Sequence, residues 1–533
     1  MAAVRPAEPY PDGSWWGWGD EAQVPVLPEA VRTLLADGLG VSAPGRSPGS
    51  LEAFELPPAR ISPDEFADAV GPANVSGQTT LRIRHARGKS TPDLLRLRAG
   101  ELGGVPDVVV FPGSHDEVMA VLERCSARRI AVVPFGGGTS VVGGLEPELG
   151  GLTGVVALDL RRMNALLDLD EESRVAVLEP GLRGPQAEGL LDQRGFTLGH
   201  FPQSFEYATV GGFAAARSSG QASAGYGRFD EMVVSVQLAA PAGTLSLGRA
   251  PRSAAGPDLR QLVLGSEGTF GVITSVGVQV HPAPEVRQYD GWRLASFSAG
   301  IELVRQLAQD GPLPTVVRLS DEAETALNLA NPGALGSGRA GCLVILGYEG
   351  SAEHVRGLRG EANRLLEDAG AQLDREAGEA WERDRFRGPY LRDALLSAGA
   401  LVETLETVTF WSRLPPLYAA VSAALRDALM EQGTPPVVLC HVSHVYPSGA
   451  SLYFTVGCAQ AENPIAQWRT AKAAASDAIL AAGGSITHHH GVGTDHRRWY
   501  EEEVGELALD VLRAVKAQLD PAGIMNPGVL IPR

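Results

Sequence analysis

The sequence predicts an α+β fold that combines two different kinds of domain. From about 102 to 282, short apolar strands alternate with short helices and are separated by Gly and Pro. From about 288 to 460, strands alternate with pairs of longer helices, a pattern typical of an antiparallel sheet with helices on one face. With 533 residues, 44 % of them apolar and 20 % charged, the chain is long enough and apolar enough for two or three globular domains.

These changes in pattern divide the chain into four segments. Residues 1–100 are Pro-rich and irregular, and three tryptophans within 15–19 indicate a segment that docks on the body of the protein. Residues 101–285 form the first domain, and residues 286–460 form a cap that we expect to contact the substrate. Residues 461–533 form a helical C-terminal segment that we expect to return to the first domain.

The individual elements follow from periodicity, caps and turn residues. Strands are expected at 130–134, 155–160, 175–178, 233–239, 272–281, 315–319, 342–348, 436–445 and 451–458. Helices are expected at 115–128, 184–194, 210–218, 297–309, 351–369, 414–431, 463–482 and 498–518, with shorter helical patches near 29–38 and 62–69.

The net charge argues against two classes of partner, and the cysteine content argues against a disulfide framework. The formal charge of −18 would repel nucleic acids and anionic membrane surfaces, so neither is expected as the main partner. Cys125, Cys342, Cys440 and Cys458 form no C-x-x-C pair and are too few for a disulfide framework, so we expect buried free thiols in a reducing compartment. The sequence shows no apolar run of about 18 residues and no secretory signal, which predicts a cytoplasmic protein.

The first chemical signal is the glycine-rich loop at 134–144, which directly follows a predicted strand. Gly136, Gly137 and Gly138 carry no Cβ, so their backbone N–H groups can turn toward one centre and form an anion-binding nest. Thr139 and Ser140 add hydroxyl donors, which suits a diphosphate. The loop is neither G-x-G-x-x-G nor a P-loop, because no G-K-[ST] follows. On its own, such a loop is as often a flexible turn as a phosphate site.

Two further glycine loops follow it. Residues 203–209 lead into Gly211 and Gly212 at the start of a short helix, and residues 265–273 lead into a predicted strand. A glycine pair at a helix start allows close approach of a phosphate. Each loop alone is compatible with an ordinary turn, but three at these intervals are hard to obtain by chance.

Together, P-x-G-G-G-T-S, S-x-E-x-x-T-V-G-G and G-S-E-G-T-x-G-V-I resemble the FAD-binding domain of the vanillyl alcohol oxidase/p-cresol methylhydroxylase class of flavoproteins. In that class the first loop wraps the diphosphate, the second approaches the isoalloxazine and ribityl chain, and the third closes over the adenine side. The resemblance implies a two-subdomain FAD-binding domain followed by the cap. It also implies these cofactor-binding residues: Pro134, Phe135, Gly136, Gly137, Gly138, Thr139, Ser140, Gln203, Ser204, Phe205, Glu206, Tyr207, Ala208, Thr209, Ala216, Arg217, Ser218, Ser219, Glu267, Gly268, Thr269, Phe270, Gly271, Val272 and Ile273.

Some members of the class attach FAD covalently through a His or Cys in or near these loops. The first loop here contains neither, so non-covalent FAD is expected. His200 lies just before the second loop and is the one candidate for a covalent link. Gln203 replaces the acidic residue that opens the second loop in the relatives described next, which puts that contact with the flavin in doubt.

The second chemical signal is the run of His488, His489 and His490 followed by Gly-Val-Gly. It can be interpreted as an active-site loop, as structural packing or as a metal cluster. Neighbouring side chains on a regular element diverge, so the three rings are not expected to share one metal ion. We predict an active-site loop and no metal.

Within the flavoprotein class, this loop resembles that of the alkylglycerone-phosphate synthases, also called alkyldihydroxyacetonephosphate synthases, which make the ether bond of ether lipids. Related 2-hydroxyacid dehydrogenases carry a Glu where His489 stands here. The resemblance runs from about 15 to 530. It includes residues 16–19, 316–319, 390–393, 403–411 and 449–454.

The resemblance implies roles for three further residues. Tyr453 would be the general acid/base near the flavin, which a phenol can be if nearby cations lower its pKa. Arg392 would bind the phosphate of the substrate through two guanidinium donors, and Arg318 would support the active site. Without the resemblance, each Arg would be interpreted as part of a surface ion pair, and Tyr453 as a core residue of an apolar strand.

The implied reaction exchanges the acyl group of an acyl-dihydroxyacetone phosphate for a fatty alcohol through a flavin N5 adduct. Tyr453 would move the proton at the reacting carbon, and the histidine loop would activate the departing carboxylate or the alcohol. The alternative is an FAD-linked oxidoreductase that oxidises a 2-hydroxy acid, whose carboxylate Arg392 would hold. The implied partners are a lipid-like phosphate ester and a fatty alcohol. A homodimer and peripheral membrane contact are further implications.

Overall fold

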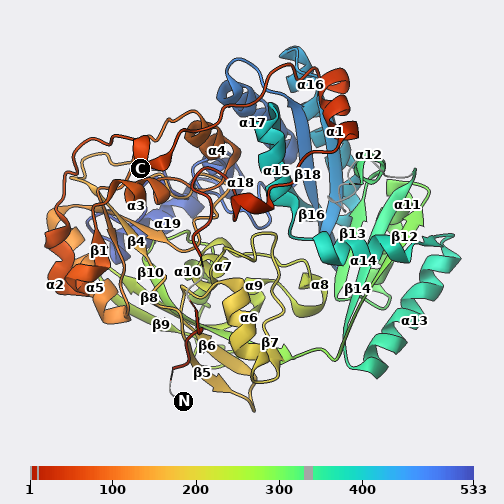
Figure 1. Cartoon of the computed structure of the whole chain (residues 1–533). Coiled ribbons are helices and arrows are strands. Elements are labelled where there is room, and N and C mark those ends of the chain that lie inside the picture. The colour runs from red at the N-terminus through yellow and green to blue at the C-terminus, as the bar shows by residue number, and fades with distance from the viewer. Residues whose placement is uncertain (1–2, 9–10, 329–339, 533) are drawn as a thin grey trace.

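Two smaller sheets and one large sheet organise the protein (Figure 1). The computed structural model describes residues 3–8, 11–328 and 340–532. Within these residues, none of the helices has both the length and the apolar character needed to cross a membrane. The four cysteines are buried and free, as expected from their number and spacing.

The first small sheet carries the glycine-rich loop at the end of a parallel strand. Its order is β1-β2-β4-β3, with β2, β4 and β3 parallel and β1 antiparallel at the edge. The strands are Val75–Ser76 (β1), Val108–Val110 (β2), Ala131–Phe135 (β3) and Val155–Asp159 (β4). Helix α5, His115–Arg128, begins at Ser114, which caps the N–H of Glu117, and ends at Arg129 in the left-handed conformation. Strand β3 then delivers the loop to the carboxyl edge of the parallel strands, where ligands commonly bind.

The second small sheet is antiparallel, with the order β5-β6-β10-β8-β9. Its strands are Leu166–Asp170 (β5), Val175–Leu178 (β6), Val233–Ala240 (β8), Gly243–Leu247 (β9) and Val272–Gln279 (β10). A separate pair joins β7, Phe196–Thr197, to β11, His281–Pro282. Helices α6, Gly184–Asp192, and α7, Val210–Ala216, pack against this layer through a core that includes Leu190, Phe213 and Val276.

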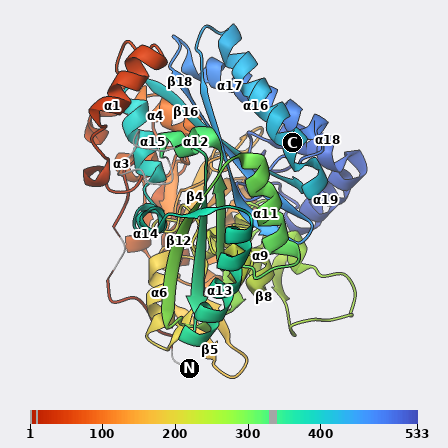
Figure 2. The same ribbon diagram turned by 90° about the vertical axis from the view of Figure 1, so that its right-hand side faces the viewer.

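The large sheet is antiparallel throughout the described residues, as predicted for the cap, and its order is β15-β12-β14-β13-β17-β18-β16. Its strands are Val286–Leu294 (β12), Val316–Ser320 (β13), Cys342–Gly350 (β14), Gln372–Leu373 (β15), Ala400–Phe410 (β16), Val437–Tyr446 (β17) and Gly449–Ala459 (β18). The helices around it are Phe297–Gln309 (α11), Glu322–Leu327 (α12), Ala352–Asp368 (α13), Arg375–Asp384 (α14), Gly388–Ser397 (α15), Leu414–Glu431 (α16) and Pro464–Ala481 (α17). Figure 2 shows α11 and α13 in front of the strands, and α16 beside α17.

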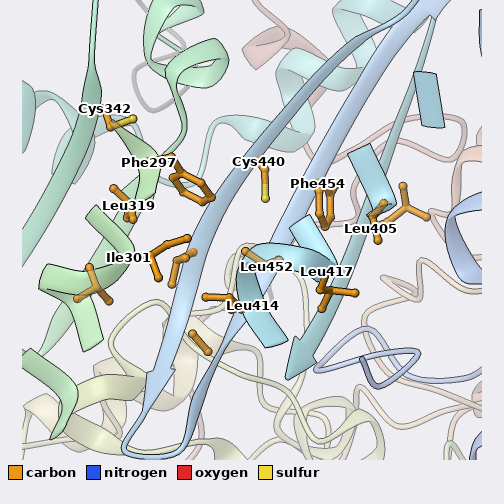
Figure 3. Close-up of a cluster of buried hydrophobic side chains, with 14 of the residues drawn as sticks. Phe297, Ile301, Leu319, Cys342, Leu405, Leu414, Leu417, Cys440, Leu452 and Phe454 are labelled. Atoms are coloured by element: carbon orange, nitrogen blue, oxygen red, sulfur yellow. The ribbon is translucent and has the colours of Figure 1, made fainter. Parts of the chain in front are cut away.

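Alternation along the strands separates an apolar face from a polar face. Leu319, Cys440, Leu452 and Phe454 point into the core formed with α11 and α16 (Figure 3). Because successive side chains of a strand point to opposite faces, the residues between them point the other way. This opposite face bears the polar groups described below.

The N-terminal segment lies over both bodies (Figure 1). Trp18 packs against Tyr207 and Tyr390, and its backbone N–H donates to the Asp393 carboxylate. Further on, α1, Glu29–Thr33, contributes Val31 to a core shared with α15 and β16. The segment therefore links the second glycine loop to the cap.

Several elements of the chain were not expected from its pattern, β5, β9, α14 and α15 among them. Strands β12 and β16 were not predicted, and β16 is hard to recognise because it buries the carboxylates Glu403 and Glu406 among its apolar residues. The helix expected at 498–518 is two helices, α18, Arg497–Val504, and α19, Glu506–Leu519. They separate at Gly505, whose φ of 80° does not continue a right-handed helix.

Candidate active site

A cavity of about 400 Å³ lies between the three glycine loops and the polar face of the large sheet. Residues 134–141 and 267–268 form one wall, and α15 with strands β13, β17 and β18 forms the other. His489 and His490 of the histidine loop close one side. The three glycine loops, the histidine loop and the cap, in which the sequence analysis predicted site residues, therefore all line one cavity.

The first glycine loop offers free backbone donors to this cavity. No N–H group from Gly136 through Ser140 donates a hydrogen bond to another protein atom in the described part of the chain. These five residues line the cavity, and backbone N–H groups that have no acceptor in the protein suit an anion there. Donors converging in this way suit the diphosphate of a dinucleotide.

Close packing explains why this loop needs glycine. A Cβ on Gly136 would lie 2.4 Å from Thr209 Oγ1, and one on Gly137 would lie 1.9 Å from the Tyr207 carbonyl oxygen. Gly138 has a φ of +66°, which side chains with a Cβ rarely adopt. The first and second loops therefore touch through their backbones, which turns the free N–H groups toward the cavity.

The second and third loops complete the cradle. Thr209 caps α7 by accepting from the N–H of Gly212. Glu267 accepts hydrogen bonds from the N–H groups of Val492 and Gly493, which ties the third loop to the histidine loop. Burial raises the pKa of Glu267 to about 7, and these two hydrogen bonds oppose that rise.

The proposed cofactor residues divide into two groups. Those that line the cavity are Pro134, Phe135, Gly136, Gly137, Gly138, Thr139, Ser140, Gln203, Ser204, Ala208, Thr209, Ala216, Ser218, Ser219, Glu267, Gly268, Gly271 and Ile273. Those that lie in the same loops without lining it are Phe205, Glu206, Tyr207, Arg217, Thr269, Phe270 and Val272. The side chains of the second group point away from the cavity; that of Phe270, for example, packs into the core of the second small sheet.

Three residues form a polar row across the sheet. The register pairs Glu406 of β16 with Tyr453 of β18, and Tyr453 with His441 of β17. Directly paired residues share a face, so all three point to the cavity side of the sheet. His441 and Tyr453 stack with their ring centroids 4.9 Å apart. Glu406 and His441 were absent from the sequence-based prediction.

Glu406 anchors the histidine loop. Its side chain is 2 % exposed and accepts from Thr487 Oγ1 at 2.5 Å and from the backbone N–H groups of His488 and His490 at 2.5 and 2.9 Å. The Nδ1 atoms of His489 and His490 lie 3.7 and 3.8 Å from its oxygens. Burial disfavours the charge, yet these histidines and the Thr487 hydrogen bond hold the pKa of Glu406 well below its usual range. A buried carboxylate thus fixes where the imidazoles point.

The loop histidines are neutral at neutral pH. Burial lowers the pKa of His490 to about 3, and burial also lowers the pKa of His489. His488 does not line the cavity; its Nε2 contacts the Tyr446 hydroxyl at 2.6 Å. His489 and His490 therefore present unprotonated rings to the cavity, and His488 contacts His489 from behind.

A group of three imidazoles lies at the cavity wall, with His444 and His489 lining the cavity and His488 behind them. The ring nitrogens of His444, His488 and His489 lie within 4.8 Å of one another, an arrangement that a metal ion could use. The loop is irregular, so its neighbouring rings converge, with 3.0 Å between the Nδ1 atoms of His488 and His489. The His444 Nδ1 already lies at hydrogen-bond distance from the hydroxyls of Ser219 and Ser223, at 3.0 and 2.8 Å. The absence of a metal in this site stays a prediction.

Arg318 is held by a buried acid. Its Nη2 donates to Glu324 Oε1 at 2.5 Å and lies 3.0 Å from His441 Nδ1. Burial opposes ionisation of Glu324, but His441 and Arg318 lower the pKa of its carboxyl to about 2. The positive charge of Arg318 at the cavity wall is therefore balanced by the Glu324 carboxylate, which also fixes the orientation of the guanidinium plane.

Arg392 presents an incompletely bonded guanidinium to the cavity. Its Nη1 donates to the Lys89 carbonyl at 2.9 Å, and its buried Nε has no partner among the described residues. Lys89 donates from Nζ to the Ser14 carbonyl at 2.8 Å, and burial lowers its pKa to about 8. The N-terminal segment thus supports Arg392 through Lys89, a residue that the sequence did not single out.

Tyr453 differs from the sequence-based expectation in its acidity. Burial raises the pKa of its phenol, and the nearby Arg392 and the Thr404 hydrogen bond only oppose that rise. The expected lowering by cations is wrong because desolvation is the larger effect. At neutral pH the residue is a protonated phenol that can donate a hydrogen bond or a proton.

Comparison with known proteins gives a consistent relationship. The family of FAD binding domains matches residues 106–247, and that of the C-terminal domains of FAD linked oxidases matches residues 283–530. An alkyldihydroxyacetonephosphate synthase of Dictyostelium discoideum is 33 % identical over 96 % of this chain and 85 % of its own length.

Solved structures agree with this. The structure of an alkyldihydroxyacetonephosphate synthase superposes with a TM-score of 0.82 at 29 % identity, covering 97 % of this chain and 98 % of the other. A p-cresol methylhydroxylase structure shares the fold at 16 % identity, with a TM-score of 0.69 over 88 % of this chain and 96 % of the other. The free donors of the glycine loop fit FAD, and the chain belongs to the alkyldihydroxyacetonephosphate synthase family of FAD-dependent enzymes.

Proposed function

We propose that the protein exchanges the acyl group of an acyl-dihydroxyacetone phosphate for a fatty alcohol. The observation that carries this proposal is the convergence of Tyr453, His490 and Arg392 on one cavity beside the glycine loops. A phenol, a neutral imidazole and a guanidinium supply proton donation, proton acceptance and phosphate binding, which are the three tasks of the exchange.

Arg392 is the residue best suited to bind the phosphate. Its Nε and Nη2 have no hydrogen-bond acceptor in the described part of the chain, and a guanidinium binds two oxygens of one phosphate at once. The wall beside it is apolar, with Leu391 and Leu395 of α15 and Val402 of β16 lining the cavity. A phosphate site next to an apolar wall suits a substrate with one charged end and one long alkyl chain.

The proton carriers follow from their protonation states. The carbon–oxygen bond to the acyl carboxylate breaks and a bond to the alcohol oxygen forms, so the alcohol must lose a proton. His489 and His490 line the cavity with unprotonated rings and would relay this proton from the alcohol to the departing carboxylate. Tyr453 lines the same cavity, and we assign to its phenol the exchange of the proton at the reacting carbon. Glu406 keeps the two imidazoles aimed at the cavity throughout.

The cofactor in this proposal is non-covalent FAD, held by the free N–H groups of residues 136–140. FAD held there would supply an electron-poor ring able to take up and return an electron pair, so the exchange would need no net oxidant. His200, the candidate for a covalent link, is fully buried against Phe213 and Phe229 and is not among the described residues that line the cavity. This position supports non-covalent binding.

The test is incubation of purified, FAD-loaded protein with acyl-dihydroxyacetone phosphate and hexadecanol. We expect release of the fatty acid and formation of the alkyl ether in equal amounts. Anaerobic mixing should leave the flavin band near about 450 nm largely oxidised at the end of turnover. Lasting bleaching by a 2-hydroxy acid, without ether formation, would assign the protein to the oxidoreductase alternative instead.

A further inference from the structure

A second cavity, of about 440 Å³, is lined in part by Thr494 and Asp495, which follow the histidine loop in the chain. It is enclosed by α17, by residues 494–501 and by α4, Thr91–Arg98. The lining residues on which the argument rests are Arg96, Trp468, Arg469, Lys472, Asp495 and Arg498. We refer to it below as the second cavity.

One face of α17 forms its floor. Ile465, Trp468, Arg469 and Lys472 are spaced at i, i+3, i+4 and i+7, so they lie on one side of the helix. Trp468 is 7 % exposed, which makes it a fixed apolar wall. The helix therefore presents two cations above a rigid aromatic surface.

Lys472 is the unusual member of this set. It is only 5 % exposed, lines the second cavity, and forms no hydrogen bond or ion pair with the described residues. Asp495 also lines the cavity; burial raises its pKa to about 7, and the charge of the nearby Lys472 opposes that rise without a direct hydrogen bond or ion pair between the two. The buried ammonium group of Lys472 is thus only partly compensated, and an anion in the cavity would complete the compensation.

The other cations can contribute because their own pairings are weak. Arg469 is exposed and has no ion pair in the described part of the chain. Arg96 lies 3.6 Å from Glu146, and Arg498 lies 3.7 Å from Asp477, in partly exposed pairs that exchange partners readily. In a protein with a formal charge of −18, this concentration of cations stands out.

We propose that the second cavity binds the phosphate group of a phosphate ester, with Lys472 and Arg469 as its main ligands. Two unpaired cations match a phosphate dianion better than a single carboxylate. The ester can be a soluble molecule or the head group of a phospholipid, since both present the same group.

Such a ligand would lie behind the active-site wall. The backbone N–H groups of Thr494 and Asp495 donate to the Val142 carbonyl, and Thr494 Oγ1 donates to the Gly143 carbonyl. The segment that lines the second cavity thus supports the far end of the first glycine loop. The inference goes beyond the proposed reaction and does not depend on it.

The experiment uses the FAD-loaded full chain with Arg392→Met, so that phosphate binding in the active site is reduced. Inorganic phosphate and glycerol 3-phosphate are titrated by calorimetry into this protein and into versions that also carry Lys472→Met, Arg469→Gln or Arg513→Gln. Arg513, on α19 and paired with Asp510, is a control for the loss of one positive charge elsewhere. We expect roughly tenfold weaker binding or more for Lys472→Met, weaker binding for Arg469→Gln, and no change for Arg513→Gln.

The two sources of the phosphate group are separated with vesicles. Phosphatidylcholine vesicles with and without phosphatidate are sedimented with the same proteins. Binding that requires phosphatidate and is lost in Lys472→Met and Arg469→Gln assigns a lipid head group, whereas binding of glycerol 3-phosphate alone assigns a soluble ester. The proposal is overturned if inorganic phosphate, glycerol 3-phosphate and phosphatidate vesicles all fail to bind, or if all the variants bind them with equal affinity. Arg469→Gln changes an exposed side chain, so it remains informative if Lys472→Met does not fold.

Discussion

Glu406 and His490 are joined twice: a Glu406 oxygen accepts the backbone N–H of His490 at 2.9 Å, and it lies 3.8 Å from the Nδ1 of the same residue. The same carboxylate accepts the N–H of His488 and the Thr487 hydroxyl. The part of the loop that carries the imidazoles is therefore held by one carboxylate of β16, while Glu267 holds Val492 and Gly493 further along the loop. The carboxylate acts by positioning the imidazoles.

This relationship predicts that Glu406→Gln lowers the rate of ether formation. A glutamine has one acceptor oxygen, and its NH₂ group would face N–H donors, so the loop must move. A displacement of about 1 Å in an active site can cost about 10²-fold, and we expect a loss in kcat of that order with FAD retained. Glu403→Gln is the matched control, because Glu403 lies on the same strand but accepts from Trp468 and not from the loop. Equal losses in the two variants would contradict the positioning role.

Gly137→Ala is expected to prevent FAD binding. The added Cβ would lie 1.9 Å from the Tyr207 carbonyl oxygen, which is backbone and cannot rotate away. The first loop must then separate from the second, and its N–H groups lose their common direction. The ratio of absorbance near about 450 nm to that at 280 nm measures the flavin content of the purified protein. Gly151→Ala, at a position with open space around it, should keep full flavin content. Normal flavin content in Gly137→Ala would refute this account of the loop.

The sequence predicted those parts of the site whose residues are contiguous in the chain, and missed those that only the fold brings together. The glycine loop and the histidine run are contiguous, so residues such as Gly137 and His490 could be found from the sequence itself. The partners that orient them come from other strands. Glu406 meets the loop only because β16 pairs with β18 in one register, and no local pattern encodes that register.

The fold shows the same division. Strand β6 and helix α11 have the predicted bounds because alternation and a serine cap mark them locally. Strand β16 was missed because acids that look solvent-exposed in sequence are buried by tertiary contacts. The acidity of Tyr453 was misjudged for a related reason: the cation nearby was visible in the sequence, but the extent of desolvation was not.

Tyr453→Phe is expected to reduce kcat by at least about 10²-fold, the usual cost of removing a general acid or base. The ring would still stack on His441, so the fold and FAD content should be unchanged. Steady-state kinetics of ether formation, with the flavin spectrum as a check, provide the measurement. Tyr418→Phe removes a hydroxyl that bonds to Asp321 instead, and we expect it to keep most of the activity. A KM effect without a kcat effect would place Tyr453 in substrate binding only.

Glu267→Gln is expected to change the pH dependence of stability in a defined direction. Burial raises the pKa of Glu267 from 4.5 to about 7, so the folded protein holds a proton that the unfolded chain has released between these values. Its contribution to stability is fully present below the unfolded pKa and is lost as pH rises through the folded pKa; a shift of this size corresponds to about 3 kcal/mol.

Glutamine mimics the protonated form at every pH and still offers an oxygen to the N–H groups of Val492 or Gly493. The Tm of FAD-loaded Glu267→Gln should therefore rise relative to that of the wild type as pH increases from about 5 to about 8. The other titrating groups contribute equally to both proteins and cancel in the difference between the two Tm values. For the control Glu353→Gln, on the exposed side of α13, the difference in Tm from the wild type should not change with pH. A flat difference for Glu267→Gln as well would mean that this carboxyl is ionised in the folded protein, and that the histidine loop is held by a charge on Glu267.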